Sequence, residues 1–344
     1  MLEKGTAVAS QKDYSSDRLL DIKGLNTYFF LPEGVVKGVN DISFHVNNGE
    51  ILGIVGESGC GKSVTALSIM GLIAWPPGKI VSGEIYFQGK DVRNFSPLQL
   101  RRIRGNKISM IFQEPMTSLN PIYTIGHQIA EVYTAHWGFH KKEAREKTME
   151  ILGKVQIPSP AHRFHEYPHQ LSGGMRQRAM IAMALACNPE LILADEPTTS
   201  LDVTIQAQIL ELMMGLQELL GTSIVLITHN LGLVAEFAKR IIVMYAGKMV
   251  EEAPVFSIFE DPLHPYTIGL LDAIPKLGQK ARQGKRRLAE IPGMVPNLID
   301  LPGGCPFHPR CCKAKDICRK VEPKFVQVEA DRGVACWAII EQWK

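Results

Sequence analysis

A run of eight residues, Gly56-Glu57-Ser58-Gly59-Cys60-Gly61-Lys62-Ser63, has the composition and spacing of a phosphate-binding loop, or P-loop. It matches the pattern GxxxxGK[ST], in which glycines allow backbone N–H groups to point inward at a triphosphate. The following helix offers its positive N-terminus, Lys62 is expected to neutralise β- and γ-phosphate oxygens, and Ser63 can hold Mg²⁺. Such a match arises by chance in on the order of one in a hundred chains of this length. The predicted nucleotide-binding residues here are Gly56, Ser58, Gly59, Cys60, Gly61, Lys62, Ser63 and Val64.

Two adjacent carboxylates, Asp195 and Glu196, follow an apolar run that begins at Leu191. An α/β sheet binds its ligands at the carboxyl ends of its strands, so a strand here delivers both acids to that edge. Asp195 is the predicted Mg²⁺ partner. Glu196, which faces the other way on an extended chain, is predicted to orient or deprotonate the attacking water. An acid pair by itself more often marks a solvated turn or a helix N-cap, but the P-loop favours the catalytic interpretation.

A P-loop lies between a strand and a helix, and the sequence predicts a strand, a loop and a helix in that order. Residues 51–55 form a continuous apolar strand that enters the loop, and residues 63–72 have helical composition. Downstream, predicted helices alternate with short buried strands, which implies right-handed crossovers and a parallel sheet covered on both faces. The helices are expected at 175–186, 205–220 and 231–238, and the strands at 191–194 and 223–228.

The first half of the chain adds an antiparallel part and a helical part to this core. Residues 124–155 are polar and helical in pattern, and we place a helical subdomain at about 114–188. β-branched and aromatic residues mark the remaining strands. These are expected at 19–30, 35–46, 83–87 and 107–112, with the first two paired antiparallel.

The composition of the sequence changes after residue 252, where prolines recur from Pro254 to Pro309 with little hydrophobic periodicity between them. We therefore predict one domain at residues 1–255 and a smaller, Pro-rich and Cys-rich region at 256–344. A chain of 344 residues is long enough for two domains, or for one large domain with an appendage.

Composition excludes several classes of protein. Hydrophobic residues make up 45% and charged residues 21%, so the chain is neither disordered nor fibrous. The net charge is +3 and there is no dense basic stripe, which argues against a nucleic-acid binder; we interpret the short basic cluster at 285–287 as solvated loop.

No apolar run approaches the roughly 18 to 20 residues that cross a bilayer, and we expect no signal peptide in the polar first 20 residues. We therefore expect a cytosolic protein.

A second glycine-containing helix start, Leu171-Ser172-Gly173-Gly174-Met175-Arg176-Gln177-Arg178, completes a family pattern. With the two motifs above, it resembles the signature of ATP-binding cassette (ABC) ATPases, and the resemblance covers about residues 19–255. It implies an α/β nucleotide-binding domain of the ABC type, with a parallel-sheet P-loop core, an antiparallel β subdomain and a helical subdomain, that hydrolyses ATP. In this family the signature of one subunit closes over the γ-phosphate held by another subunit. Ser172, Gly173 and Gly174 are therefore expected to act in trans.

The same resemblance gives roles to four more positions. Gln113 matches the Q-loop glutamine that touches Mg²⁺ and water, and His229 matches the switch histidine that contacts the γ-phosphate. Asp202 lies in the D-loop that crosses the dimer interface, and Phe29 stands in place of the aromatic residue that stacks on adenine. The implied catalytic residues are Glu196, His229 and Gln113, and the implied Mg²⁺ ligands are Ser63, Gln113 and Asp195.

Two residues depart from the family pattern. Asn230 follows the switch histidine where Asp is common, which removes a charge near the site but no obvious catalytic group. Cys60 stands in the P-loop where Ser is frequent. Its position beside a helix N-terminus predicts a thiolate that alkylating reagents reach unless ATP is bound.

Three stretches, at residues 113–121, 264–267 and 304–311, resemble the ATP-binding subunits of dipeptide and oligopeptide importers. Nickel importers share much of this pattern, so the ATPase subunit of a nickel importer is an alternative. The resemblance implies a peripheral subunit on the cytoplasmic face of the membrane. Its implied partners are a paralogous ATPase subunit, two transmembrane permease subunits and, through these, an extracytoplasmic peptide-binding protein. A soluble ABC protein acting on nucleic acid or ribosomes is disfavoured, because the chain has one cassette and no coiled-coil insertion.

Five of the seven cysteines lie in the last 40 or so residues. Disulfides are improbable in a reducing cytosol, so clustered thiols more often bind metal, and four thiolates suit either zinc or an iron–sulfur cluster. Free surface thiols are the remaining alternative. Cys312 falls where peptide importers usually have another residue type. The cysteines that match those importers, some of which carry a [4Fe-4S] cluster, are Cys305, Cys311, Cys318 and Cys336, and we expect that cluster here, with zinc as second choice.

Overall fold

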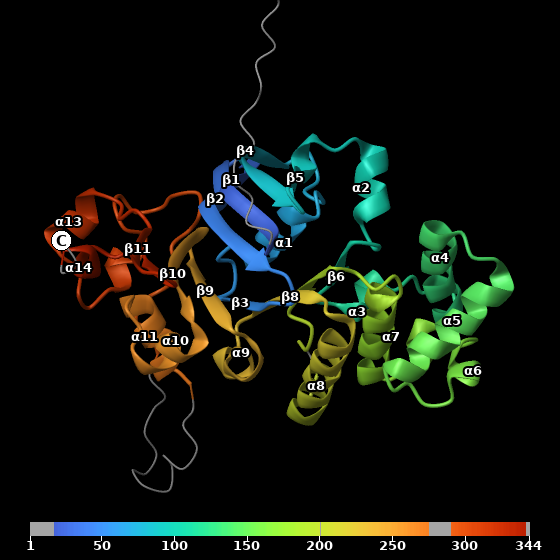
Figure 1. The fold of residues 1–344 in the computed structure, drawn as a ribbon. Coiled ribbons are helices and arrows are strands. Elements are labelled where there is room, and N and C mark those ends of the chain that lie inside the picture. The colour runs from blue at the N-terminus through green and yellow to red at the C-terminus, as the bar shows by residue number, and fades with distance from the viewer. Residues whose placement is uncertain (1–16, 200, 275–289, 342–344) are drawn as a thin grey trace, which may run out of the picture.

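The computed structural model describes residues 17–199, 201–274 and 290–341, which form two β-sheets and the helices around them (Figure 1). The basic cluster predicted as loop at 285–287 lies outside the described residues. The strands are β1 (Arg18–Leu31), β2 (Gly34–Asn47), β3 (Ile51–Val55), β4 (Gly78–Phe87), β5 (Lys90–Asp91), β6 (Ile108–Ile111), β7 (Leu191–Asp195), β8 (Ser223–Thr228), β9 (Arg240–Tyr245), β10 (Lys248–Pro254), β11 (Val326–Glu329) and β12 (Arg332–Val334). The helices are α1 (Lys62–Ile69), α2 (Pro97–Ile103), α3 (Pro115–Ser118), α4 (Ile125–Trp137), α5 (Lys141–Lys154), α6 (Pro160–Arg163), α7 (Gly173–Leu185), α8 (Val203–Leu220), α9 (Leu231–Phe237), α10 (Val255–Glu260), α11 (Pro265–Asp272), α13 (Asp316–Lys320) and α14 (Trp337–Ile340), with 3-10 helices η1 (Val92–Asn94), η2 (Pro168–Gln170) and η3 (His308–Arg310).

The large sheet has eight strands in the order β11-β12-β10-β9-β3-β8-β7-β6. Its five strands from β9 to β6 are parallel, and every residue of β3, β7 and β8 is buried. Continuous apolar strands are what a parallel sheet covered on both faces requires, so the predicted parallel core is confirmed. The register aligns Val55 with Thr228 and Asp195 with Ile227. The ends of β3, β7 and β8 therefore meet at one edge of the sheet.

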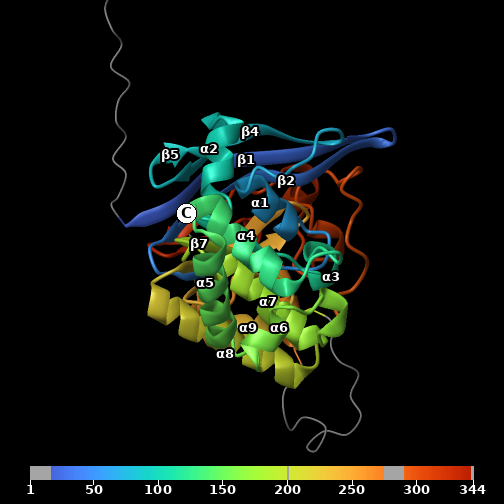
Figure 2. The same ribbon diagram turned by 90° about the vertical axis from the view of Figure 1, so that its right-hand side faces the viewer.

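The small sheet is antiparallel, in the order β2-β1-β4-β5, and it lies across the end of the molecule opposite α8 and α9 (Figure 2). β1 and β2 pair from Arg18 opposite Asn47 to Leu31 opposite Gly34, which confirms the predicted antiparallel opening. Residues of β1, β2, β3 and α1 share one hydrophobic core cluster, so α1 is held between the two sheets.

The helical part consists chiefly of α4, α5 and α7, which project to one side of the sheets (Figure 1). The helical pattern predicted at 124–155 is two helices. Gly138 ends α4 with a left-handed φ of 71°, and α5 begins at Lys141. Glycine adopts this conformation without the steric cost that other residues meet, which makes it a common helix stop.

The C-terminal region is attached to the large sheet along its edge. β12 pairs antiparallel with β10, placing Glu251 opposite Val334, and β11 continues the sheet beyond β12. Phe307 is buried in the same core cluster as the parallel strands. Sheet pairing therefore crosses the domain division predicted near residue 255. Among the described residues, no helix is both long and apolar enough to span a bilayer.

Candidate active site

The P-loop (56–63) joins β3 to α1 by a path that only glycine can follow at two positions. Gly56 and Gly61 have φ values of 154° and 103°. A Cβ on Gly56 would lie 2.3 Å from the carbonyl oxygen of Met244, and one on Gly61 would lie 2.2 Å from that of Gly38. Real Cβ atoms do not come this close to backbone oxygens, so the two glycines let the loop turn tightly against β9 and β2.

Lys62 and Ser63, the last residues of the P-loop, point into the site. Lys62 Nζ donates to the carbonyl oxygens of Gly56 and Glu57, at 2.8 and 3.0 Å. Ser63 Oγ donates to Asp195 Oδ1 at 3.0 Å. Burial raises the pKa of Asp195, and the hydrogen bond from Ser63 opposes that rise. A hydroxyl beside a buried carboxylate is a donor set that suits Mg²⁺, whose charge would offset the cost of burying the anion.

The three side chains predicted to be catalytic meet at Glu196. Gln113 Nε2 donates to Glu196 Oε2 at 2.9 Å, and His229 Nδ1 lies 3.2 Å from Glu196 Oε1. Each residue follows a different strand, β6, β7 or β8, and the parallel order of these strands brings them together. Thr199, which the sequence analysis does not single out, also contacts the carboxylate, since its Oγ1 donates to Glu196 Oε2 at 2.8 Å.

Glu196 does not continue the extended chain of β7. Its φ is 45°, in the left-handed region, and its N–H donates to the carbonyl oxygen of Ile227 at 2.9 Å. The prediction that Glu196 turns away from Asp195 by strand alternation is therefore wrong, because the strand ends at Asp195 and a strained turn aims the carboxylate instead. Burial raises the pKa of Glu196, but hydrogen bonds from His229 and Thr199 outweigh burial and leave the pKa below its ordinary value. The carboxylate is ionised at neutral pH, as a base must be.

We expect Thr199→Val to lower kcat for ATP hydrolysis about three- to tenfold. The variant loses one hydrogen bond that orients the Glu196 carboxylate and lowers its pKa. The KM for ATP should stay within about twofold, since Thr199 has no described hydrogen bond to the P-loop. Steady-state ATPase kinetics measure both constants. Thr199→Ser keeps the hydroxyl and is the matched control, and equal losses in the two variants would contradict the role of the hydroxyl.

Asn230, the departure from the family pattern, has a structural role that explains its residue type. Its Oδ1 accepts from the N–H groups of Gly232 and Leu233, at 3.0 and 3.4 Å, and so caps α9. Asn and Asp are about equally good N-caps, so the cap that follows His229 survives the loss of a negative charge.

Phe29 lies between β2 and β4, near the start of α1. A Cβ on Gly38 would lie 3.0 Å from the Phe29 ring and 3.4 Å from Val64, and a Cβ on Gly78 would lie 2.8 Å from the other edge of the ring. Two facing glycines thus make room for the half-buried ring. Phe29 and Val64 are therefore close to the P-loop, as adenine stacking by Phe29 requires, and that role stays a prediction.

The signature residues Ser172, Gly173 and Gly174 form a separate half of the predicted site. Ser172 Oγ caps α7 by accepting from Met175 N at 3.3 Å. Asp202 Oδ1 caps α8 by accepting from Ile205 N at 3.0 Å. In the described part of the chain, no hydrogen bond or ion pair joins these caps to the P-loop; Ser200, beside Asp202 in the D-loop, is not described.

The thiol of Cys60 contradicts its predicted reactivity. Cys60 is 1% exposed, and burial raises its pKa although the nearby Lys62 charge lowers it. Helix α1 begins only at Lys62, and the Cys60 side chain turns inward. The prediction of an accessible thiolate is wrong, because the low-dielectric core disfavours the charged form more than the helix and Lys62 favour it. Lys62 Nζ donates to Cys60 Sγ at 3.8 Å, and the Cys60 carbonyl oxygen accepts from Gly247 N. The part that Cys60 takes in nucleotide binding stays a prediction.

We expect a maleimide to label exposed Cys312 in the folded apoprotein while Cys60 stays unlabelled, with or without ATP. Peptide mass spectrometry after brief labelling measures the difference, and denaturation before labelling should expose Cys60. Cys312→Ser is the control that removes the fast site. Labelling of native Cys60 that ATP suppresses would restore the original hypothesis.

Four C-terminal cysteines lie close enough to influence one another. Burial raises the pKa of Cys305 to about 11, with further rises from the charges of Cys318, Cys336 and Cys311. The Cys318 sulfur also accepts from Lys315 N at 3.5 Å. Among the described residues, however, no group of three or more His, Cys, Asp or Glu side chains is arranged to hold a metal ion.

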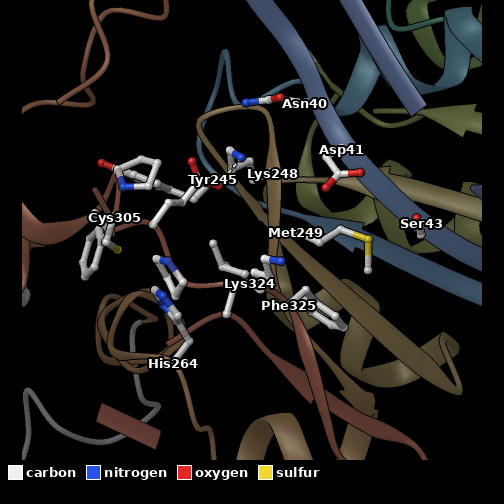
Figure 3. A pocket seen from close by; sticks show the side chains of 16 residues that line it. Asn40, Asp41, Ser43, Tyr245, Lys248, Met249, His264, Cys305, Lys324 and Phe325 are labelled. Carbon is white, nitrogen blue, oxygen red and sulfur yellow. Dashed lines mark hydrogen bonds and ion pairs between the residues drawn. The ribbon is translucent and has the colours of Figure 1, made fainter. Parts of the chain in front are cut away.

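A cavity of about 520 Å³ is lined by residues of the C-terminal region and of β2, β9 and β10 (Figure 3). Tyr245, His264 and Cys305 lie on one side of it, and Asp41 and Ser43 lie on the other. Burial lowers the pKa of His264 to about 3, so this side chain is neutral. Neither the P-loop nor the carboxylates of the active site line the cavity, which is therefore distinct from the nucleotide site.

Comparisons with known proteins agree with this geometry. Residues 39–199 match the ABC transporter family, and residues 250–318 match the oligopeptide/dipeptide transporter C-terminal region. The oligopeptide transport ATP-binding protein AppD of Bacillus subtilis is 51% identical over 324 residues, covering 94% of this chain and 98% of that protein. The dipeptide transport ATP-binding protein DppD of Escherichia coli is 49% identical over 318 residues, covering 92% and 96%.

A solved structure shares the fold of the cassette. The dimeric, post-hydrolysis ATP-binding cassette MJ0796, bound to ADP and phosphate, matches with a TM-score of 0.62 and 28% identity, covering 69% of this chain and 98% of that one. The unmatched third of the chain is consistent with an added C-terminal region. The chain belongs to the ABC transporter family of ATP-binding proteins, in the group that carries the oligopeptide/dipeptide transporter C-terminal region.

Proposed function

We propose that this ABC ATPase powers the import of dipeptides or oligopeptides from the cytoplasmic face of the membrane. The observation that carries the ATPase assignment is the meeting of Gln113 and His229 at Glu196, beside the P-loop. The relatives named above are ATP-binding proteins of oligopeptide and dipeptide transport, which favours peptides over nickel as the cargo. The peptide itself does not meet this chain, since a nucleotide-binding subunit contacts only its permease and ATPase partners.

In the reaction, ionised Glu196 takes a proton from the attacking water as the water oxygen bonds to the γ-phosphorus. The bond from that phosphorus to the bridging oxygen of ADP breaks, and ADP and phosphate are formed. Gln113 and His229 hold the carboxylate, and Lys62 offers positive charge to the phosphate oxygens. Ser63, Asp195 and Gln113 would hold Mg²⁺, which would supply charge neutralisation for the triphosphate.

Reconstituted transport tests this function. The full assembly in liposomes, with a binding protein and labelled peptide on one side and ATP on the other, should accumulate peptide. The matched Glu196→Gln assembly should accumulate none. ATP-dependent uptake of Ni²⁺ without uptake of any di- or oligopeptide would overturn the peptide assignment and favour the nickel alternative.

We infer that the working unit contains a second, paralogous ATPase subunit, two permease subunits and, outside the membrane, a peptide-binding protein. Ser172 and Asp202 cap α7 and α8 and make no described hydrogen bond to the P-loop, which supports a site completed by another subunit. The similar cassette MJ0796 is dimeric when bound to ADP and phosphate. Co-expression with the permeases, followed by mass spectrometry of the purified assembly, tests the composition. Two identical copies of this chain in an active assembly would contradict the heterodimer.

We further propose that Cys305, Cys311, Cys318 and Cys336 hold a [4Fe-4S] cluster, with zinc as the alternative. The chemistry of the donor set supports this, because thiolates are the ligands of both groups. Burial, and then the charges of neighbouring cysteines, raise the pKa of Cys305, Cys311 and Cys336. The raised pKa values mean that binding would release protons. Iron, acid-labile sulfide and zinc are measured on anaerobically purified protein. Cys311→Ser should lose the metal and Cys312→Ser should keep it, whereas metal-free parent protein would overturn the proposal.

A further inference from the structure

An arginine of the C-terminal region forms an ion pair with the P-loop. Arg310, at the end of η3, lies 253 residues from Glu57 along the chain. Its Nη1 donates to Glu57 Oε2 at 2.7 Å and its Nη2 donates to Glu57 Oε1 at 3.0 Å. The arginine side chain is only 4% exposed, and that of Glu57 is 27% exposed. A shielded, two-pronged ion pair of this kind is directional and is worth more than a surface pair.

Arg310 is itself held by contacts with the C-terminal region and with Tyr245 of β9. Its Nε donates to the carbonyl oxygen of Pro292 at 3.0 Å, and its Nη2 donates to that of Ile291 at 3.3 Å. The guanidinium lies over the rings of Tyr245 and Phe307, at 5.8 and 6.0 Å from their centroids. Because these contacts fix the guanidinium before it meets Glu57, little side-chain entropy is lost in forming the ion pair.

A second C-terminal residue holds the backbone of the same P-loop position. Tyr266, in α11, is fully buried, and its hydroxyl accepts from the N–H of Glu57 at 2.8 Å. This N–H therefore faces the C-terminal region and not the phosphate cradle. On its other side, the carbonyl oxygen of Glu57 accepts from Lys62 Nζ at 3.0 Å. Glu57 thus links the C-terminal region to the lysine that meets the phosphates.

We propose that the C-terminal region positions the P-loop through Arg310 and Tyr266 and thereby sets the affinity of this subunit for ATP. Without the two contacts, the chain between β3 and α1 must be ordered when the nucleotide binds, and that cost lowers affinity. Arg310 and Tyr266 are positioning residues, because both bond Glu57 and act on the phosphates only through the P-loop. Arg310 lies between Cys305 and Cys311 in the sequence. A change in the position of these two cysteines would therefore move the residue that contacts the P-loop. Coupling is reciprocal, so bound ATP should also stabilise the C-terminal region.

The test compares Arg310→Met with Arg332→Met in the full chain. Arg332 is a matched control, because it bonds Asp261 within the C-terminal region, is 12% exposed and does not contact the P-loop. Titration of a fluorescent ATP analogue should show a Kd raised about fivefold or more by Arg310→Met and unchanged by Arg332→Met. In ATPase assays of the assembled transporter, Arg310→Met should raise KM with kcat within about twofold.

Three further variants separate positioning from mere loss of stability. Arg310→Lys keeps one charged hydrogen bond and should restore part of the affinity. Tyr266→Phe should raise the Kd on its own, because it leaves the Glu57 N–H without an acceptor. Glu57→Gln combined with Arg310→Met should be no worse than the worse single variant, since both act through one contact. Fully additive effects, or a Kd that Arg310→Met and Arg332→Met change equally, would overturn the proposal.

Discussion

Replacing Glu196 with glutamine is expected to stop ATP turnover while leaving ATP binding intact. The carboxylate sits at the meeting point of Gln113, Thr199 and His229, ionised and aimed by a strained backbone turn. Glutamine keeps the shape and can keep two of these hydrogen bonds, but it cannot accept a proton from water. Removing a general base commonly costs about 100-fold or more in kcat, and we expect a loss of at least that size.

Single-turnover hydrolysis and equilibrium ATP binding measure the two effects separately. The Kd for ATP should stay within about threefold of the parent value, because Lys62, Ser63 and Asp195 are untouched. Since ATP is then retained, the variant should also favour the closed dimer in gel filtration with ATP. Glu190→Gln is a matched control, as Glu190 pairs with Lys107 at the opposite end of β7. Hydrolysis by Glu196→Gln at the parent rate would show that another group is the base.

The parts of the site that could be predicted from sequence are those set by short-range patterns. Gly56 to Ser63 are contiguous, and their loop follows from glycine geometry between a strand and a helix. The meeting of Gln113, Glu196 and His229 follows from topology, because each ends a strand of one parallel sheet and parallel strands end at the same edge. The chain-order pattern of strands and helices was therefore enough to place them together.

Features that depend on contacts between residues far apart in the sequence could not be predicted from such patterns. The Arg310 to Glu57 contact joins residues 253 apart, and neither residue type nor local spacing indicates its partner. Cys60 is buried, and Gly247, in the turn after β9, donates its N–H to the Cys60 carbonyl oxygen, whereas the sequence pattern predicts no strand at 240–254. The left-handed turn at Glu196 was also hidden, since a non-glycine residue there gives no sign of positive φ. Such strain persists where surrounding structure fixes it, which is typical of functional sites.

Replacing Lys62 with methionine is expected to weaken ATP binding strongly, whereas Glu196→Gln should leave ATP binding intact. Lys62 is 5% exposed, and its ammonium is held inside the P-loop by the carbonyl oxygens of Gly56 and Glu57. When the triphosphate binds, this charge supplies hydrogen bonds to phosphate oxygens in a shielded site, where they are strong. Methionine has a similar length and no charge. We expect the Kd for ATP to rise about 100-fold, equivalent to about 3 kcal/mol.

Equilibrium titration with an ATP analogue checks this loss, and a thermal melt without nucleotide checks that the variant folds. Lys107→Met is the matched control, because Lys107 pairs with Glu190 on the surface and should leave the Kd unchanged. The melting temperature of the parent should rise with added ATP, whereas that of Lys62→Met should not, since a ligand stabilises only a protein that binds it. An unchanged Kd in Lys62→Met would mean that the triphosphate does not occupy the P-loop, and the roles given to Ser63, Asp195 and Glu196 would fail with it.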